Sequence, residues 1–146
     1  MLYVFNIVAN QMNWQKTSFA LAGNQTVILT ASGTWGVIDP AHRGQCGPAG
    51  NGVTGTGDII APGAKEGALL CRTADGNVVA FPESCTVTLR IPGPLEFIAN
   101  DYTSTGAGFS DNFGSLIVNA NVIDEAIVID KAKITSLKDK DSVIIR

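Results

Sequence analysis

The residues best suited to chemistry lie at the two ends of one loop. Asn100-Asp101-Tyr102 precedes this loop and Asp111-Asn112-Phe113-Gly114-Ser115 follows it, and the residues between them are Thr, Ser, Gly and Ala with one Phe. A loop of this composition bends easily, so it can gather the carboxylates and a carboxamide. Hard cations such as calcium take about six to eight oxygen ligands of this kind. The alternative interpretation is that these Asx side chains only cap turns.

The sequence carries none of the familiar catalytic patterns. It has no G-x-S-x-G, H-E-x-x-H, P-loop or dinucleotide-binding motif. His42, the only histidine, has no nucleophile motif near it, and the cysteines lack the C-x-x-C spacing of zinc sites. The remaining acidic side chains in the central region are scattered and are interpreted as solvated: Asp58, Glu66, Glu83 and Glu96. We therefore expect that this protein is not an enzyme.

Composition limits the class of protein further. A chain of 146 residues is most simply one domain with a real core, and its 16% of charged and 45% of apolar residues argue against disorder. The net charge is −3 and Lys and Arg do not cluster, so we expect no nucleic-acid partner. No apolar run approaches the roughly 20 residues of a membrane span, so we expect no membrane insertion.

The compartment is not fixed by the sequence. The stretch from Met1 to Asn6 has neither a basic region nor a small-residue cleavage site, so it does not resemble a secretory signal peptide. Cys46, Cys71 and Cys85 can form one disulfide and leave one thiol, or remain three thiols. Cys71 and Cys85 are candidates for neighbouring strands.

Short β-prone segments dominate the chain. Each is edged by Gly, Pro, Asn or Asp: residues 2–8, 26–31, 68–72, 78–81, 86–91, 95–99 and 116–122. Asp75-Gly76 predicts a hairpin turn, because this dipeptide readily takes the positive φ angles that such turns need. No long window shows the period of an amphipathic helix. The pattern predicts an all-β protein, a small jelly-roll-like antiparallel β-sandwich.

Two regions depart from this rhythm. Residues 39–66 are rich in Gly, Pro, Ala and Thr and are expected to form long loops over one end of the sandwich, either as a binding surface or without a role. Residues 124–146 are expected to form a β-rich C-terminal extension to a sandwich of residues 1–123. Its strands are expected either to extend the chain's own sheet or to pair with the sheet edge of a neighbouring subunit.

Several segments, in order, resemble the calcium-dependent galactophilic lectins of the LecA (PA-I) type. The Asn100-Asp101 and Asp111–Ser115 pair resembles the family's metal loop. Earlier segments resemble its opening strand and turn, its G-D-x-I-x-I-x-A-x-G-W segment and its G-A-L-V strand: Val8-Ala9-Asn10 with Thr17-Ser18, Gly23–Trp35, and Gly67-Ala68-Leu69-Leu70. The resemblance covers roughly residues 6–122 and implies a β-sandwich that holds one Ca²⁺ at its apex.

The resemblance also implies which residues would bind calcium and sugar. Side-chain ligands would be Asp101, Asp111 and Asn112, with backbone carbonyls from Val37 and from Gly108, Thr105 being the alternative mid-loop position. Hydroxyl groups of a galactose-like glycan would complete the shell, and the candidate sugar contacts are Asp101, Tyr102, Thr105 and Asp111. Tyr102, Phe109 or Trp35 could stack on the sugar, although core packing is the alternative for these aromatic residues.

The chain departs from the family in one important place. Nothing in residues 44–65 matches the family's His-Pro-x-Gln sugar-contact segment. The expected function is that of a calcium-dependent carbohydrate-binding module. We also expect the protein to form a homo-oligomer. The alternative is a self-assembling structural subunit of an extracellular fibre or sheath with a calcium-stabilised loop. The expected location is extracellular or on the cell surface, and a cytoplasmic location stays open.

Overall fold

The computed structural model describes residues 1–37, 45–105 and 107–125, and in these ranges it contains strands and loops but no helix. No part of it therefore forms a helix that could cross a membrane. The strands are β1 (Leu2–Val8), β2 (Gln15–Leu21), β3 (Gln25–Ser32), β4 (Trp35–Gly36), β5 (Leu69–Arg72), β6 (Val78–Ala80), β7 (Thr86–Leu89), β8 (Gly93–Ala99) and β9 (Phe113–Asp124).

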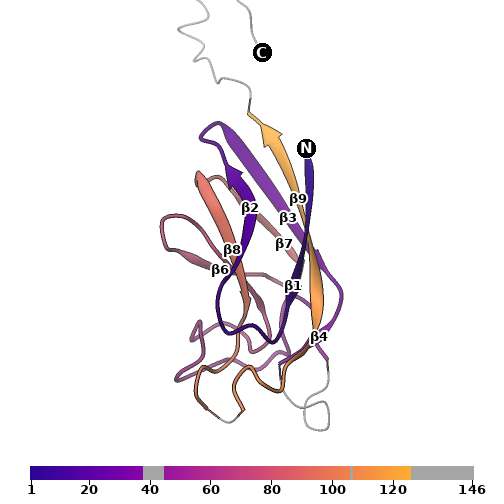
Figure 1. Ribbon diagram of the computed structural model, residues 1–146, viewed down its shortest axis with the longest axis vertical. Helices are drawn as coiled ribbons and strands as arrows, with labels where there is room; N and C mark the ends of the chain where they lie inside the picture. The colour runs from indigo at the N-terminus through magenta and orange to yellow at the C-terminus, as the bar shows by residue number, and fades with distance from the viewer. Residues whose placement is uncertain (38–44, 106, 126–146) are drawn as a thin grey trace, which may run out of the picture.

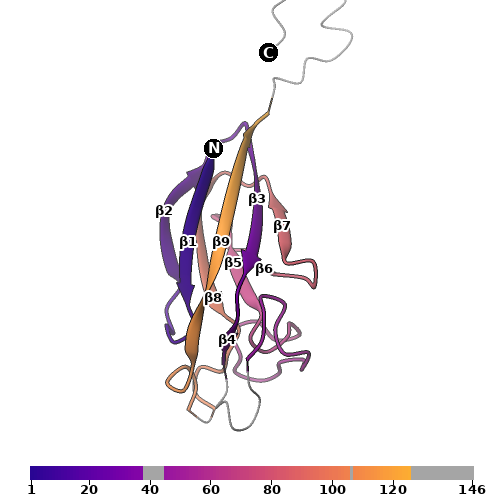
Figure 2. The ribbon, with the colours of Figure 1, turned by 90° about the vertical axis from the view of Figure 1, so that its right-hand side faces the viewer.

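The strands form two antiparallel sheets that pack face to face (Figures 1 and 2). The first sheet has the order β1-β9-β3-β7, and β4 extends it by pairing with the beginning of β9. The second has the order β2-β8-β5-β6. The prediction of an all-β antiparallel sandwich is thus confirmed.

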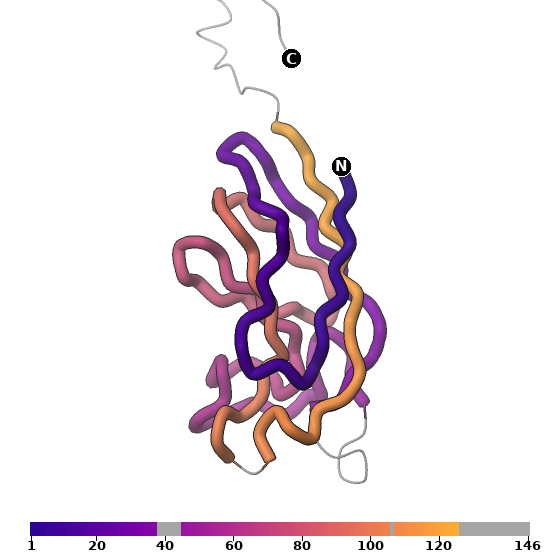
Figure 3. The backbone as a smooth tube through the Cα atoms, in the orientation of Figure 1, coloured from indigo at the N-terminus to yellow at the C-terminus, as the bar shows by residue number. Residues whose placement is uncertain are grey.

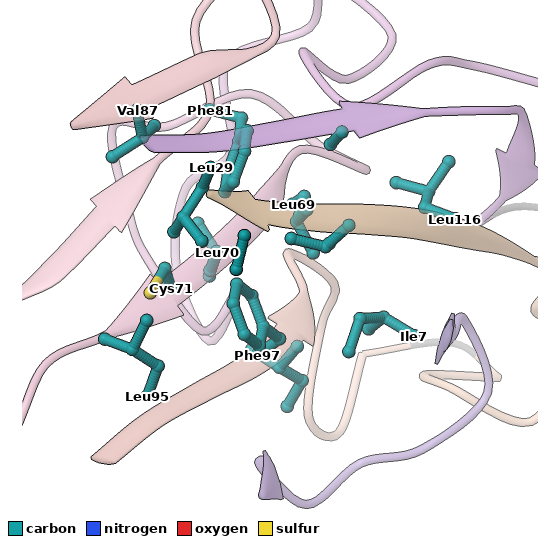
Figure 4. Close-up of a cluster of buried hydrophobic side chains, with 14 of the residues drawn as sticks. Ile7, Leu29, Leu69, Leu70, Cys71, Phe81, Val87, Leu95, Phe97 and Leu116 are labelled. Carbon is teal, nitrogen blue, oxygen red and sulfur yellow. The ribbon is translucent and has the colours of Figure 1, made fainter. Parts of the chain in front are cut away.

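The core lies between the two sheets because alternate residues of each strand point inward. On β3, Val27 and Leu29 are buried, whereas Thr30, the residue after Leu29, is exposed. On β8, Phe97 is fully buried and contributes a large ring to the cluster in Figure 4, where it lies among side chains from both sheets. This burial of apolar surface is what fixes the strand register, since a shift by one residue would turn each apolar set toward water.

Every strand expected from the β-prone segments is present with small changes at its ends, and β9 extends to Asp124. Two strands were not predicted. β2 was missed because its exposed face is polar and charged; Thr17 and Ser18, expected near a turn, lie in its middle. β4 has only two residues. The hairpin turn at Asp75-Gly76 is confirmed, with Gly76 at a φ of 86°. The extension lies outside the described residues after Glu125.

Cys46, Cys71 and Cys85 are all free thiols, so they form no disulfide bond. The expectation that Cys71 and Cys85 lie on neighbouring strands is wrong. Cys71 lies on β5 in the second sheet, whereas Cys85 ends the turn before β7 in the first. Burial raises the pKa of the Cys71 thiol to about 12, which makes it an unreactive core residue.

The two ends of the sandwich differ in character (Figure 3). The N-terminus and the end of β9 lie together at one end, where Met1 exchanges backbone hydrogen bonds with Val122. The loops between β4 and β5 and between β8 and β9 lie together at the other end. The predicted metal loop is therefore positioned by the ends of β8 and β9, which belong to different sheets.

Candidate functional site

The loop after β8 is held against the long loop that precedes β5. Tyr102 and Ile59 form an antiparallel bridge. On either side of it, Ile60 N donates to Asp101 O at 3.1 Å and Thr103 N donates to Asp58 O at 3.2 Å. These backbone bonds bring residues that are more than forty positions apart in the sequence to one end of the molecule.

Asn100 is a structural anchor rather than a candidate ligand. Its side chain is fully buried, its Oδ1 accepts from Ala61 N at 2.8 Å, and its Nδ2 donates to Ala61 O at 3.2 Å and to Lys65 O at 3.0 Å. All the hydrogen-bonding capacity of the amide is directed into the long loop. Asn100 thereby fixes the position of Asp101, the next residue.

Three side-chain oxygens at this end are buried and have no hydrogen-bond partner among the described residues. They are Asp101 Oδ2, Asp111 Oδ1 and Asn112 Oδ1. The other atoms of two of these groups are engaged: Asp101 Oδ1 accepts from Tyr102 N at 2.7 Å, and Asn112 Nδ2 donates to Ala9 O at 2.8 Å. These bonds leave one oxygen of each group available.

Unpartnered buried acceptors are costly, and each one in a folded protein calls for an explanation such as an ion. Asp101 is only 3% exposed and Asn112 only 7%. A water molecule has two protons to donate, whereas these groups present three acceptors, two of them on carboxylates. Two carboxylates and a carboxamide oxygen are donors of the type that a hard divalent cation such as calcium takes, and such an ion would offset the charge of the carboxylates.

The electrostatics of Asp101 agree with this arrangement. Burial raises its pKa to about 6, against an ordinary value of 3.8. The backbone N–H of Tyr102 and the side chain of Asn112 act in the opposite direction. The charges of Asp111 and Glu66 raise the pKa further. The carboxylate of Asp101 is therefore held among other acidic groups without a described counter-charge.

No three His, Cys, Asp or Glu side chains form a metal cluster in the part of the chain that the structure describes. The candidate site is of a different type, because it combines the two aspartates with the carboxamide of Asn112. Backbone carbonyls would have to supply further ligands.

The predicted carbonyl donors, Val37 and Gly108, lie near this end. The Val37 side chain is buried beside Gly67, whose N–H donates to Asn100 O at 2.8 Å. Gly108 has a φ of 56°, and a Cβ there would lie 3.1 Å from Tyr102 O, so the loop backbone folds closely over Tyr102. Their roles as ligands stay predictions.

Thr105 is engaged with a neighbouring carboxylate. Its N–H donates to Asp58 Oδ2 at 2.9 Å and its hydroxyl donates to Asp58 Oδ1. Ser104 donates to the same carboxylate through its N–H and its hydroxyl, each at 2.7 Å. These donors, the hydroxyl of Thr105 first, hold the pKa of Asp58 well below its usual range. Asp58 thus caps the turn at residues 103–105, and sugar contact by Thr105 stays a prediction.

The three aromatic residues that are candidates for stacking on a sugar differ in their burial. Trp35 is fully buried and donates from Nε1 to Gly67 O at 2.8 Å, and Phe109 is also buried. Both belong to the core cluster, so neither offers a ring face to a ligand. Tyr102 is only partly buried, and it remains the stacking candidate.

Glu66 is the residue that the sequence interpretation missed. The sequence predicts a solvated side chain, but Glu66 is only 5% exposed. Its Oε2 accepts from the Tyr102 hydroxyl at 2.6 Å and its Oε1 accepts from Asn51 Nδ2 at 3.2 Å. The hydrogen bond to Glu66 raises the pKa of Tyr102. The one available signal was its position immediately before Gly67 and the buried strand β5, where a charged side chain is placed at the edge of the core.

Comparisons with known proteins give a fold relationship. No protein-family model matches the chain, and no curated protein matches it. Among solved structures it is similar to one described as "EclA N-terminal domain; PllA-like lectin", with a TM-score of 0.56 and 15% sequence identity. The alignment covers 83% of this chain and 96% of the other. The chain therefore has the β-sandwich fold of a lectin domain.

Proposed function

We propose that this protein is a calcium-dependent, non-enzymatic carbohydrate-binding module. The observation that carries the proposal is the set of three buried, unpartnered oxygens of Asp101, Asp111 and Asn112 at the loop end of the sandwich. The fold similarity to a PllA-like lectin domain supports the same assignment.

The chemistry of calcium links the metal to the sugar. Three side-chain oxygens and one or two backbone carbonyls leave part of a shell of about six to eight ligands open. Adjacent hydroxyl groups of a sugar can replace water in that part, and the carboxylates can accept hydrogen bonds from the same hydroxyls. Tyr102 is partly buried and its N–H donates to Asp101 Oδ1, and its ring can pack against the apolar face of a galactose-like sugar.

A location outside the cell or on its surface would suit such a site. Calcium sites of extracellular modules have dissociation constants of about 10⁻⁴–10⁻³ M. A site with only three side-chain ligands and no described counter-charge is expected near that range, where cytosolic calcium would leave it empty.

The first experiment is calorimetric titration of the full chain with calcium, followed by a glycan array with calcium and with chelator. We expect one calcium per chain and glycan binding that is lost in chelator. Asp111→Asn should weaken calcium binding at least tenfold, since it removes a charge at the metal. Asp75→Asn is the matched control, because Asp75 accepts hydrogen bonds only within its own exposed hairpin turn. Glycan binding that is equally strong in chelator would overturn the proposal.

A second candidate function is a self-assembling structural subunit whose loop is stiffened by calcium. The observation that favours it is the edge of β1, which has no strand partner on its outer side among the described residues. Calcium binding without binding to any glycan would select this function over the first.

A further inference from the structure

Strand β1 forms an open edge of the first sheet, since β9 is its only partner strand among the described residues. Backbone groups along an edge strand alternate between the neighbour and the open side. Met1 and Ala9 both bond to β9, the first to Val122 at 3.0 Å and the second to Gly114 at 3.0 Å. The N–H and C=O groups of the even-numbered residues therefore point away from the sheet.

One of these even-numbered residues already has a substitute partner. Val8 N donates to Gln15 Oε1 at 3.0 Å, and Gln15 Nε2 donates to Val8 O at 2.9 Å. The side-chain amide pairs with Val8 as a residue of a neighbouring strand would. Leu2, Val4 and Asn6 remain with backbone groups for which the described residues offer no strand partner.

The other three sheet edges carry features that discourage pairing with another chain. β6 and β7 have only three and four residues, and β2 carries Lys16 and an irregular register after it. Short strands, charges and bulges are common protections of this kind. By contrast β1 has seven residues without a charge or a proline, and Leu2 and Val4 are 62% and 61% exposed.

We propose that β1 pairs antiparallel with β1 of a second copy of this chain, about a twofold axis at Val4. This interface goes beyond the proposed sugar-binding function, because it lies on a sheet edge rather than on the loops. An antiparallel edge is self-complementary, since each free N–H meets a free C=O when the strand faces its own copy. The absence of charge on β1 means that two copies of a chain with a net charge of −3 meet without like charges in contact.

The register follows from the Gln15 cap. Because Val8 is occupied, the three available residues pair fully only when Leu2 lies opposite Asn6 and Val4 lies opposite Val4 of the other copy. The same register places Tyr3 opposite Phe5 on the inner face. Both rings are only partly buried, and both pack against Phe19, at centroid distances of 4.9 Å and 6.5 Å. Pairing would extend this aromatic cluster across the interface.

The last described residue after β9, Glu125, is held by three hydrogen bonds. Glu125 N donates to Asn24 O at 2.8 Å, and the Glu125 carboxylate accepts from Arg90 Nε at 3.3 Å and from the Thr26 hydroxyl. These contacts lie on the β3 and β7 side of β9, opposite to β1.

Sedimentation velocity of the full chain, from micromolar to hundreds of micromolar, tests the proposal. We expect a concentration-dependent dimer that Val4→Lys converts to a monomer, because the two lysines would face each other. Ile123→Lys is the matched control, since Ile123 is also exposed on the outer face but lies on the central strand β9. It should keep the dimer, and circular dichroism should show that both variants fold. A wild-type monomer at every concentration, or a dimer unchanged by Val4→Lys, would overturn the proposal.

Hydrogen exchange separates the second copy from the chain's own extension. The amides of Leu2, Val4 and Asn6 should become protected as the protein concentration rises. Protection that is the same at all concentrations would show that a segment of the same chain covers the edge, and this too would overturn the proposal.

Discussion

Asp101 combines deep burial with a carboxylate oxygen that has no described partner. Asp111 and Asn112 in the candidate site each present one such oxygen as well, whereas Asp101 Oδ1 and Asn112 Nδ2 form hydrogen bonds to the backbone. Buried acceptors of this type are unfavourable unless something compensates them. These three oxygens are the atoms that the proposed cation would compensate.

The raised pKa of Asp101 predicts an unusual pH dependence without metal. Its pKa of about 6 exceeds the ordinary 3.8, so between these values the folded chain binds more protons than the unfolded chain. The free energy of unfolding contributed by this group therefore falls as pH rises through that window. Denaturant titrations in chelator at several pH values should show this slope in the wild type and lose it in Asp101→Asn.

Calcium should abolish this contribution, since it binds the deprotonated carboxylate. In saturating calcium, Asp101 is deprotonated in both the folded and the unfolded chain above pH 3.8, so its share of the free energy of unfolding should no longer change with pH through that window. A wild-type slope in chelator that is identical to that of Asp101→Asn, or one that calcium leaves unchanged, would contradict these expectations.

The Tyr102–Glu66 hydrogen bond provides a second residue-level test. Tyr102→Phe removes the 2.6 Å donor to a buried carboxylate, which is expected to cost about 1–3 kcal/mol of stability. Tyr3→Phe is the control, because among the described residues the Tyr3 hydroxyl donates to the exposed Met1 sulfur alone, and its loss should change stability by less than about 0.5 kcal/mol. Urea denaturation measures both. Equal losses of unfolding free energy in the two variants would show that the hydrogen bond to Glu66 does not stabilise the fold more than the exposed Tyr3 contact does.

At the level of the elements, the candidate site depends on how the loop after β8 packs against the long loop that precedes β5. The segment around Gly50 lies against residues 65–68, where Asn51 N donates to Glu66 O at 2.8 Å. Asn100 attaches the same region to the end of β8. These contacts hold the predicted metal loop in a fixed position relative to the end of β8.

A pair of glycines tests this docking. Gly50 and Gly52 have similar positive φ angles, 88° and 85°, so Ala costs backbone energy of about 1–2 kcal/mol at either. Only at Gly50 would the new Cβ also meet backbone, 2.6 Å from Glu66 O, whereas nothing lies within 4 Å at Gly52. Gly50→Ala should therefore be clearly the more destabilising of the two and should also weaken calcium binding.

Thermal denaturation and calorimetry provide the two measurements. If Gly52→Ala weakened calcium binding as much as Gly50→Ala, the contact with Glu66 would not be what positions the site.

At the level of the whole molecule, the two ends of the sandwich serve different purposes. The loop end gathers the candidate metal ligands from β8, β9 and the long loop, while the opposite end holds the N-terminus and the end of β9. The open edge of β1 runs along one side of the sandwich between these ends. Calcium binding and self-association are consequently expected to be independent.

Calcium should stabilise the whole fold, because its ligands come from loops that are brought together only in the folded chain. At a concentration 100-fold above its dissociation constant, a ligand specific for the folded state adds about 2.7 kcal/mol to the free energy of unfolding. Denaturant titrations with calcium should show this gain, and equal concentrations of magnesium should give less, since magnesium requires a smaller octahedral site. No change on adding calcium would contradict the proposed site.

The sequence alone determined the strands with clear two-residue periodicity, the class of the fold and the acidic loop, because alternation and turn chemistry are local properties. It did not determine β2, whose outer face is polar, or the free state of the three cysteines, which depends on which sheet each strand joins. It also did not reveal Glu66, because a glutamate in a glycine-rich segment is ordinarily solvated. Only the tertiary structure placed that carboxylate beside Tyr102 and left three oxygens buried without partners, since burial is set by contacts between residues far apart in the chain.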